Sequence, residues 1–266
     1  MAPDVALIGF GEAGSTFARA GGWAGRARGY DIDPAREPAM AEHGIRPGIS
    51  AREAVAAAPL VISLVTADSA LAAARSTVSS LAPNAIWCDM NSVAPETKRA
   101  AARVIEAAGG RYVDAAVLAP VEPARLAVPL LLAGAAAQEA KAALAALGFS
   151  NLRVVGAEVG RASAIKMIRS VMVKGVEALT AEMMLAAEAA GVVDEVLASL
   201  DASEKAQPWA EKAAYNLERM ATHGLRRAAE MEEAAKTLAA LGVAPVMTEG
   251  TVHRQRDMAG RKHGRN

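Results

Sequence analysis

The first part of the chain alternates short apolar runs with longer segments of helical periodicity. The apolar runs predict strands at Val5–Gly9, Arg26–Asp31, Leu60–Val65, Ala85–Asp89, Arg111–Ala116, Leu130–Ala133 and Leu152–Val155. The segments between them predict helices at Ala13–Ala20, Ala51–Ala58, Asp68–Ser80, Pro95–Ala108 and Ala136–Leu147. Strands that are apolar almost throughout and alternate with helices are typical of a mostly parallel, doubly wound sheet, so the predicted fold class is α/β.

Strand patterns end near Gly160, and helical periodicity follows. A long helix is expected over Arg161–Ala190, with further helices at about 193–200, 208–222 and 225–241. The stretch 253–266 is basic and poor in large apolar side chains, so we expect a solvated tail there. These patterns place a domain boundary at 157/158, which gives an α/β domain over residues 1–157 and an all-α domain over residues 158–266.

Charge and cysteine content narrow the class of protein. Lys and Arg number 29 and Asp and Glu number 29 among 266 residues, so no broad field favours nucleic acid or an anionic membrane as a partner. Cys88 is the only cysteine, which excludes an intramolecular disulfide and suggests a reducing compartment. The longest apolar stretch, residues 126–137, is too short to span a bilayer, and no signal-peptide pattern is found, so a cytoplasmic protein is expected. The four histidines lack the spacing of metal ligands, so no metal site is predicted.

Three glycines follow the first predicted strand with the spacing G-x-G-x-x-G. Gly9 permits the tight turn between strand and helix, Gly11 lets the backbone approach a pyrophosphate, and Gly14 lets the helix pack closely on the strand. The start of the helix then offers unpaired N–H groups and the positive end of its dipole to the phosphates. The turn therefore predicts a Rossmann-type dinucleotide-binding domain over residues 1–157.

An acidic residue at the end of the second predicted strand supports this interpretation. Asp31 lies 17 residues after Gly14, close to the spacing of the carboxylate that binds the adenosine ribose. Such a carboxylate accepts hydrogen bonds from the ribose hydroxyls and repels a 2′-phosphate, so NAD is favoured over NADP. Arg28 and Arg36 are close enough in sequence to leave NADP as the alternative cofactor. The competing explanation is that Asp31 and Asp33 only open a turn before Pro34.

The long helix carries candidate acid–base groups. Lys166 and Lys174 are eight residues apart with Ser170 midway, so helical spacing places all three on one face, beside Arg169. Exposed lysines on helices are usually solvated, but Lys166 lies among Ala, Ile and Met. To act as a base, Lys166 must have a pKa below its ordinary value near 10.4, and burial beside a positive nicotinamide ring would lower it.

With these segments the chain resembles the β-hydroxyacid dehydrogenase family, which includes 3-hydroxyisobutyrate and 6-phosphogluconate dehydrogenases. GFGEAG (9–14) is similar to the family's cofactor turn, and DMNSVAP (89–95) is similar to its D-x-S-T-x-x-P substrate segment. DAAV (114–117) resembles the start of its D-A-P-V-S-G-G segment, and GRASAIK (160–166) resembles the G-x-G-x-x-x-K stretch that leads to its catalytic lysine. The family's fold implies that the all-α half forms a dimer interface and closes the active-site cleft.

The resemblance implies a role for each matching residue. Lys166 would be the catalytic residue, taking a hydroxyl proton as hydride leaves for the nicotinamide and returning it in the reverse direction. The substrate would be bound by Asn91, Ser92, Leu118, Pro120, Ser170 and Lys174. The cofactor would be bound by Gly9, Phe10, Gly11, Glu12, Ala13, Gly14, Asp31, Ile32, Val65, Thr66 and Asn91. The expected reaction is reversible oxidation of an alcohol or hydroxyacid by NAD.

The chain departs from the family pattern where the family binds its substrate. Leu118, Ala119 and Pro120 replace the serine and two glycines that help to bind a substrate carboxylate, which removes a hydroxyl and a backbone N–H donor. Ser170 replaces the family's asparagine, and residues 229–231 replace its K-D-L segment. Residues 223–245 are similar to a poorly characterised branch with its own carboxy-terminal domain. The cofactor and acid–base roles therefore transfer better than the substrate does.

Three other functions stay open at this point. Imine reduction or reductive amination occurs on the same scaffold, but there the family lysine is often replaced, whereas Lys166 is retained. Oxidation coupled to decarboxylation is disfavoured by the altered carboxylate segment. A protein that senses the dinucleotide without turnover would fit the lost substrate residues. A homodimer that acts on a small molecule is expected, because a long exposed apolar helix needs a partner.

Overall fold

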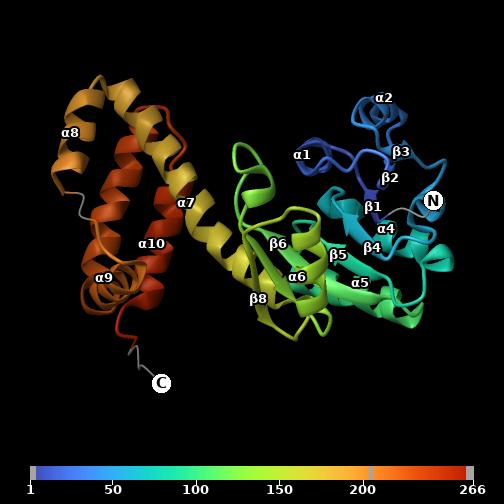
Figure 1. Ribbon diagram of the computed structural model, residues 1–266. Helices are drawn as coiled ribbons and strands as arrows, with labels where there is room; N and C mark the ends of the chain where they lie inside the picture. Colours follow the sequence, from blue (N-terminus) through green and yellow to red (C-terminus); the bar gives the residue numbers. More distant parts are fainter. Residues whose placement is uncertain (1–3, 204–205, 262–266) are drawn as a thin grey trace. The chain divides into compact units, whose positions relative to one another are not determined.

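A mostly parallel sheet organises the first part of the chain (Figure 1). In the computed structural model, which describes residues 4–203 and 206–261, eight strands are hydrogen-bonded in the order β3-β2-β1-β4-β5-β6-β7-β8. Neighbouring strands are parallel except for β6 and β7. The strands are β1 (Val5–Ile8), β2 (Ala27–Tyr30), β3 (Arg46–Pro47), β4 (Leu60–Ser63), β5 (Ile86–Asp89), β6 (Arg111–Val117), β7 (Leu130–Ala133) and β8 (Leu152–Gly156). The predicted doubly wound α/β fold is confirmed.

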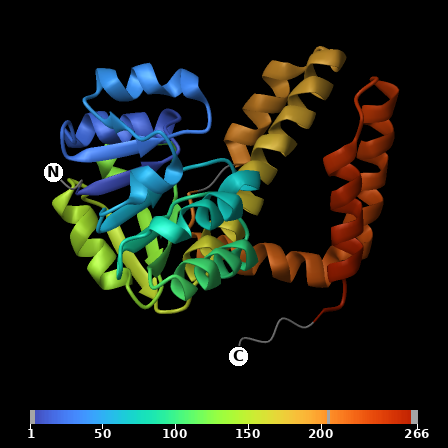
Figure 2. The same cartoon turned by 90° about the vertical axis from the view of Figure 1, so that its right-hand side faces the viewer.

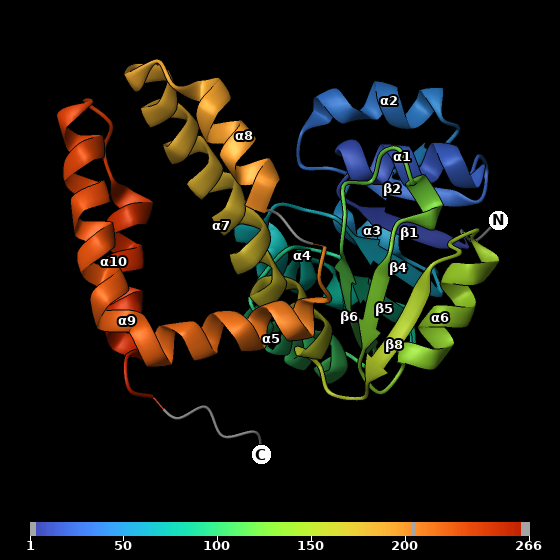
Figure 3. The same cartoon turned by 90° about the vertical axis from the view of Figure 1, so that its left-hand side faces the viewer.

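Helices cover both faces of this sheet. Successive side chains of a strand point to opposite faces, and the strands are apolar on both, so each face needs a covering layer. Leu7 belongs to a buried cluster that contains side chains of α1, α2 and α6. Its neighbours Ala6 and Ile8 belong to a second cluster, which contains side chains of α3, α4 and α5. Figure 3 shows the course of these helices. These helices are α1 (Glu12–Gly21), α2 (Glu37–Glu42), α3 (Ala51–Val55), α4 (Ala70–Thr77), α5 (Pro95–Ala107) and α6 (Ala137–Ala146). The apolar pattern did not predict the short elements β3 and α2.

The regular elements described in the second compact unit are all helical. The unit begins at Ser170, within α7, and its helices are α7 (Arg161–Ala190), α8 (Val193–Ser203), α9 (Trp209–Ala240) and α10 (Val246–Met258). α9 and α10 lie side by side (Figure 2). Within the described residues, none of the helices combines the length and the apolar character that crossing a membrane requires.

The course of α9 corrects one sequence-based prediction. We expected two helices, at 208–222 and 225–241, but a single helix continues through Gly224. A Cβ atom at Gly224 would collide with the backbone carbonyl oxygen of Gln255 in α10. The glycine is therefore explained by the close approach of two helices and not by a helix end.

A second correction concerns the predicted solvated tail at 253–266. α10 extends through the first part of this stretch, to Met258. Val252, Gln255 and Met258 are buried because their spacing places them on one face of the helix. This narrow buried stripe, which includes the polar Gln255, is hidden in the composition by the basic residues around it. Residues 262–266 of the predicted tail lie outside the described residues.

The first turns of α7 belong to the sheet unit. Asp114 of β6 accepts hydrogen bonds at Oδ2 from the backbone N–H groups of Gly160 and Ser163, each at 3.0 Å. These bonds tie the start of the helix to the sheet. The compact units consequently divide after Arg169, whereas the sequence placed the boundary ahead of the helix, at 157/158.

Candidate functional site

The glycine turn joins β1 to α1 with three distinct geometries. Gly9 has φ +94°, and a Cβ atom there would lie 2.5 Å from the carbonyl oxygen of Leu64, so the position requires glycine. A Cβ atom at Gly14 would lie 2.7 Å from the carbonyl oxygen of Gly9, so α1 packs closely on the turn. A Cβ atom at Gly11 would meet no atom within 4 Å. The backbone at Gly11 is therefore open to a ligand.

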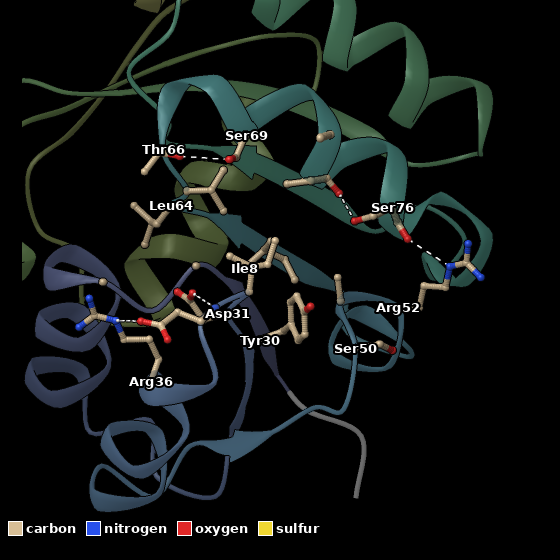
Figure 4. A pocket seen from close by; sticks show the side chains of 18 residues that line it. Ile8, Tyr30, Asp31, Arg36, Ser50, Arg52, Leu64, Thr66, Ser69 and Ser76 are labelled. Atoms are coloured by element: carbon tan, nitrogen blue, oxygen red, sulfur yellow. Dashed lines mark hydrogen bonds and ion pairs between the residues drawn. The ribbon is translucent and has the colours of Figure 1, made fainter.

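A cavity of about 740 Å³ lies at this turn. β1 is flanked by β2 and β4, so the strand order reverses at this point of the sheet. In open α/β sheets, ligands bind outside the carboxyl ends of the strands at such a reversal. The cavity is lined by Ile8, Gly9, Gly11, Tyr30, Asp31, Ile32, Asp33, Arg36, Ser50, Ala51, Arg52, Leu64, Val65, Thr66, Ser69, Ala72, Ala73 and Ser76 (Figure 4).

The carboxylate of Asp31 is held at the end of β2, beside the glycine turn. Its Oδ2 accepts a hydrogen bond from the backbone N–H of Phe10 at 2.6 Å, and its Oδ1 accepts one from the N–H of Asp33 at 2.9 Å. The next acidic side chain, Asp33, pairs with Arg36 at 3.5 Å (Figure 4). Asp31, Asp33 and Arg36 all line the cavity, so two carboxylates and one guanidinium set the charge at its β2 side.

The predicted cofactor residues differ in how they are placed relative to the cavity. Those that line the cavity are Gly9, Gly11, Asp31, Ile32, Val65 and Thr66. Phe10 and Gly14 are buried behind the turn, Ala13 packs against the core, and Glu12 is exposed at the start of α1. Asn91 lies one hydrogen bond away from the cavity, because its Oδ1 accepts the N–H of Val65 at 2.7 Å.

Sequence reasoning missed the side of the cavity formed by α3 and α4. Arg52 donates from Nε to the carbonyl oxygen of Ser76 at 3.2 Å, which joins the two helices at the rim. Oγ of Ser50 accepts the backbone N–H of Glu53 at the start of α3, and this capping pattern signals only where a helix begins. Nothing in the sequence pattern placed the small residues Ala72 and Ala73 against a ligand site.

A second group of side chains lies after the carboxyl end of β5. Lys166 of α7 donates a hydrogen bond from Nζ to Oγ of Ser92. The neighbouring Asn91 is buried, and its Nδ2 donates to Oγ of Ser63 at 3.0 Å. Lys166 is half-buried and Ser92 is exposed. The structure thus brings Lys166, Ser92 and Asn91 together, and Asn91 links this group to the cavity through its hydrogen bond with Val65.

The remaining predicted substrate residues are placed less closely. The carbonyl oxygen of Leu118 accepts a hydrogen bond from Nη1 of Arg169 at 3.1 Å, and Leu118 itself is half-buried. Pro120 is exposed on the same connection. Ser170 and Lys174 belong to the second compact unit, so their roles in substrate binding remain predictions.

Two ionisable groups near the cavity and on β5 have pKa values that are shifted by their local contacts. At the cavity rim, Oγ1 of Thr66 lies 2.5 Å from Oδ1 of Asp68, and this hydrogen bond lowers the pKa of the exposed Asp68 carboxyl below its ordinary value. On β5, burial raises the pKa of the Cys88 thiol to about 12, and the charge of Asp89 adds to that effect. Within residues 4–203 and 206–261, no group of three or more His, Cys, Asp and Glu side chains has the arrangement of a metal site.

Two family models match the chain. Residues 4–160 match the NAD binding domain of 6-phosphogluconate dehydrogenase, which is more than half of the chain. Residues 187–258 match a domain of unknown function, DUF1932. The match over the first part includes the glycine turn, Asp31 and the Asn91–Ser92 segment, and the second match spans α8, α9 and α10.

Solved structures similar to this chain include two proteins without an assigned activity. A conserved hypothetical protein from Sinorhizobium meliloti 1021 is 39% identical, with 96% of this chain and 88% of that chain covered and a TM-score of 0.64. A second, described as a conserved protein of unknown function with structural similarity to 3-hydroxyacid dehydrogenases, is 32% identical, with 96% and 97% covered and a TM-score of 0.61. An imine reductase from Myxococcus stipitatus in complex with NADP⁺ shares the fold at 19% identity, with 96% and 93% covered and a TM-score of 0.78.

Proposed function

Because this chain belongs to the family that has the NAD binding domain of 6-phosphogluconate dehydrogenase, we propose that it is an NAD-dependent oxidoreductase. The proposed reaction is hydride transfer between the nicotinamide and an alcohol or hydroxyacid substrate, with Lys166 as general acid and base. The observation that carries the proposal is the hydrogen bond from Nζ of Lys166 to Oγ of Ser92. This bond joins an amine to a hydroxyl after the carboxyl end of β5. Ser92 directly follows Asn91, which accepts a hydrogen bond from Val65 in the cavity wall.

The residues at the cavity fit a dinucleotide in shape and in charge. Gly11 leaves the space that a pyrophosphate needs, since its Cβ position is empty. The start of α1 supplies N–H groups that have no partner within the helix. The two carboxylates at the end of β2, Asp31 and Asp33, favour ribose hydroxyls over a 2′-phosphate, which supports NAD over NADP. Arg36, on the β2 side of the cavity, would be the residue that binds a 2′-phosphate, and it pairs with Asp33.

The chain's own residues would divide the work at the reacting centre. The bound nicotinamide supplies the hydride acceptor or donor. Lys166 would take the hydroxyl proton of the substrate in the oxidative direction and return it in the reverse direction. Ser92 accepts a hydrogen bond from this amine and would hold it in place. The side chain of Asn91 is hydrogen-bonded to Ser63 and Val65, which fixes the backbone of its segment. That backbone would in turn orient the substrate hydroxyl.

A second candidate is reduction of a C=N bond. It is favoured by the connection after β6, where Leu118 offers its backbone carbonyl to Arg169 and Pro120 has no N–H. Such a segment gives little to anchor a small substrate carboxylate. An imine, which has no carboxylate to anchor, would not need that contact. The retained Lys166 keeps alcohol oxidation as the first candidate.

The function can be tested with the whole chain and a substrate panel. Binding of NAD and NADP is measured first, by thermal shift. Turnover is then followed through the absorbance of the reduced cofactor with hydroxyacids, alcohols and cyclic imines. We expect NAD to bind more tightly and at least one hydroxyl compound to react. Turnover of imines alone would favour the second candidate, and cofactor binding without any turnover would favour a dinucleotide sensor.

We also propose that the protein is a homodimer formed through its helical unit. α7 presents Val171, Met172, Val176 and Leu179 to solvent in the single chain, with 76%, 47%, 49% and 44% of each residue exposed. Apolar side chains along one long helix usually mark an interface. Sedimentation should give twice the mass of the chain, and a Val171→Glu/Val176→Glu variant should sediment as a monomer. A monomeric wild-type protein would contradict the proposal.

A further inference from the structure

A buried ionic cluster lies beneath the Asn91–Ser92 segment and is not used by the proposed chemistry. Lys98 of α5 is fully buried, with its Nζ 2.9 Å from Oδ1 of Asp89 on β5 and 3.6 Å from Oδ1 of Asp114 on β6. The ammonium also donates to the backbone carbonyl oxygens of Asp89 at 2.5 Å and Ala115 at 3.4 Å. Asp89 and Asp114 are opposite each other in the register of β5 and β6. Lys98 therefore supplies the positive charge that lets two carboxylates share one buried site.

Asp89 holds the segment that carries Ser92. Its Oδ1 accepts the backbone N–H of Asn91 at 2.9 Å, and its Oδ2 accepts the hydroxyl of Tyr112 at 2.5 Å. Burial, together with the charge of Asp89, raises the pKa of Tyr112 and keeps this hydroxyl a donor. Asp89 thus fixes the backbone at Asn91, directly before Ser92.

Asp114 holds the helix that carries Lys166. Its Oδ2 accepts three hydrogen bonds at 3.0 Å, from the N–H of Gly160, the N–H of Ser163 and the hydroxyl of Ser163. A carboxylate at this place satisfies the free N–H groups at the start of α7 and interacts favourably with the helix dipole. Lys166 follows Ser163 by one turn of the same helix. Its position relative to the sheet is therefore set by Asp114.

We infer that Lys98 is a positioning residue, which locks the Ser92 segment and the start of α7 to each other and so sets the Ser92–Lys166 pair. The inference rests on the proposed function for its effect on turnover. Each carboxylate has one oxygen toward the Lys98 ammonium, and between them they hold the two chain segments that meet at the reacting centre. Without the ammonium, the carboxylates would repel one another across the two strands. The segments would then move apart, whereas the residues that line the cofactor cavity belong to neither segment.

The test compares Lys98→Met with two controls on the same helix. Ile105→Ala removes a buried apolar side chain and controls for a loss of protein stability that does not involve the ionic cluster. Arg103→Met removes an exposed positive charge and controls for the change in net charge. For Lys98→Met we expect kcat to fall by about tenfold or more, since small displacements of reacting groups have effects of this size. We expect the Kd for NADH to stay within about twofold of the wild type, and neither control to lower kcat comparably. Unchanged kcat in Lys98→Met, or an equal fall in Ile105→Ala, would overturn the inference.

Amide hydrogen exchange tests the same inference without turnover. Peptides spanning residues 89–95 and 160–166 should exchange faster in Lys98→Met than in Ile105→Ala, because the hydrogen bonds to both carboxylates are loosened. If the wild type turns over nothing on the panel, the proposed function fails, and this measurement still decides the positioning role. Exchange equal to that of Ile105→Ala in both segments would overturn it.

A variant that keeps the net charge of the cluster covers the case in which Lys98→Met does not fold. Lys98→Met/Asp89→Asn removes one charge of each sign, so the cluster keeps its net charge. We expect this variant to fold and bind NADH, yet to show the faster exchange at 160–166 and the reduced kcat. Wild-type exchange and kcat in the double variant would show that Lys98 serves only to neutralise Asp89, which would overturn the inference.

Discussion

The backbone N–H of Phe10 donates a hydrogen bond to Oδ2 of Asp31 at 2.6 Å, across 21 positions of the sequence. This bond joins the glycine turn after β1 to the acidic end of β2. It fixes the carboxylate beside the turn before any ligand is bound. A preorganised carboxylate loses little entropy when it accepts hydrogen bonds from ribose hydroxyls, so this pair would favour dinucleotide affinity.

Gly11 is predicted to be dispensable for folding but not for cofactor binding. Its φ of −75° suits any residue, and a Cβ atom there would meet nothing in the protein, so Gly11→Ala should keep its stability within about 1 kcal/mol of the wild type. The added methyl group would occupy the space expected for the pyrophosphate. The affinity for NAD should therefore fall by about tenfold or more, measured by titration calorimetry.

Gly14→Ala provides the contrast. Its Cβ atom would lie 2.7 Å from the carbonyl oxygen of Gly9, so this variant should lose about 1–3 kcal/mol in free energy of unfolding. If Gly11→Ala binds NAD as tightly as the wild type, the pyrophosphate does not lie at the glycine turn.

Asp33 is predicted to influence the choice between NAD and NADP. It pairs with Arg36 at 3.5 Å at the edge of the cavity, so it both repels a 2′-phosphate and occupies the guanidinium that would bind one. Asp33→Asn should improve the affinity for NADP relative to NAD by about tenfold, which corresponds to about 1.4 kcal/mol. Titration with both reduced cofactors, followed by fluorescence, measures the ratio.

Asp4→Asn is the matched control for this substitution. Asp4 forms an exposed pair with Arg26 at 2.7 Å and does not line the cavity. Removing the charge of Asp4 should leave the ratio of the affinities for NADP and NAD unchanged. An unchanged ratio in Asp33→Asn as well would mean that Asp31 alone excludes the 2′-phosphate.

Glu182 is predicted to make the stability of the helical unit depend on pH. Burial opposes ionisation of this carboxyl, but hydrogen bonds from the hydroxyl of Thr248 and from backbone N–H groups at the start of α10 outweigh burial and lower its pKa below the ordinary 4.5. Because the folded pKa is the lower one, the unfolded state binds more protons in the interval between the two values. The stabilisation is therefore complete above pH 4.5 and is lost as the pH falls through the folded pKa.

Glu182→Gln should remove this dependence. At neutral pH the variant should unfold with a free energy lower by about 1–3 kcal/mol, and the difference from the wild type should shrink in acid. Denaturant unfolding followed by circular dichroism provides the measurement. Glu188→Gln, an exposed change on the same helix, is the control and should be neutral. If the difference in free energy of unfolding between Glu182→Gln and the wild type is the same at every pH, ionisation of Glu182 is not the source of the pH dependence.

Cys88 is predicted to be unreactive in the folded protein. Its thiol is fully buried and its pKa is raised to about 12, so the thiolate is scarce near neutral pH. Alkylating reagents should label Cys88 only as fast as the sheet opens, and adding NAD should slow the labelling further. Rapid labelling of the native protein, followed by mass spectrometry, would contradict the burial of β5.

The sheet was predictable because its strands are buried on both faces and therefore consist of short apolar runs. The glycine turn and Asp31 could be found because their spacing is imposed by the ligand class. α9 and α10 could not be predicted correctly, since Gly224 has the same appearance in a sequence whether it ends a helix or permits a close helix crossing.

The candidate site was predictable only in part. Lys166 and Ser92 were identified through short segments similar to a known family, and the structure brings them into contact. The cluster around Lys98 could not be found in this way, because a lysine on a helix is usually solvated. Its burial depends on Asp89 and Asp114, which meet it only when β5, β6 and α5 have packed together.

The role of Lys166 is tested most directly by comparing Lys166→Met with Lys141→Met, an exposed lysine on α6. Both variants are first titrated with NADH and then assayed for kcat with the best substrate of the panel. We predict that Lys166→Met binds NADH within about twofold of the wild type but loses on the order of 100-fold or more in kcat, while Lys141→Met keeps both values. Full turnover by a Lys166→Met protein that binds its cofactor would contradict the proposed acid–base role.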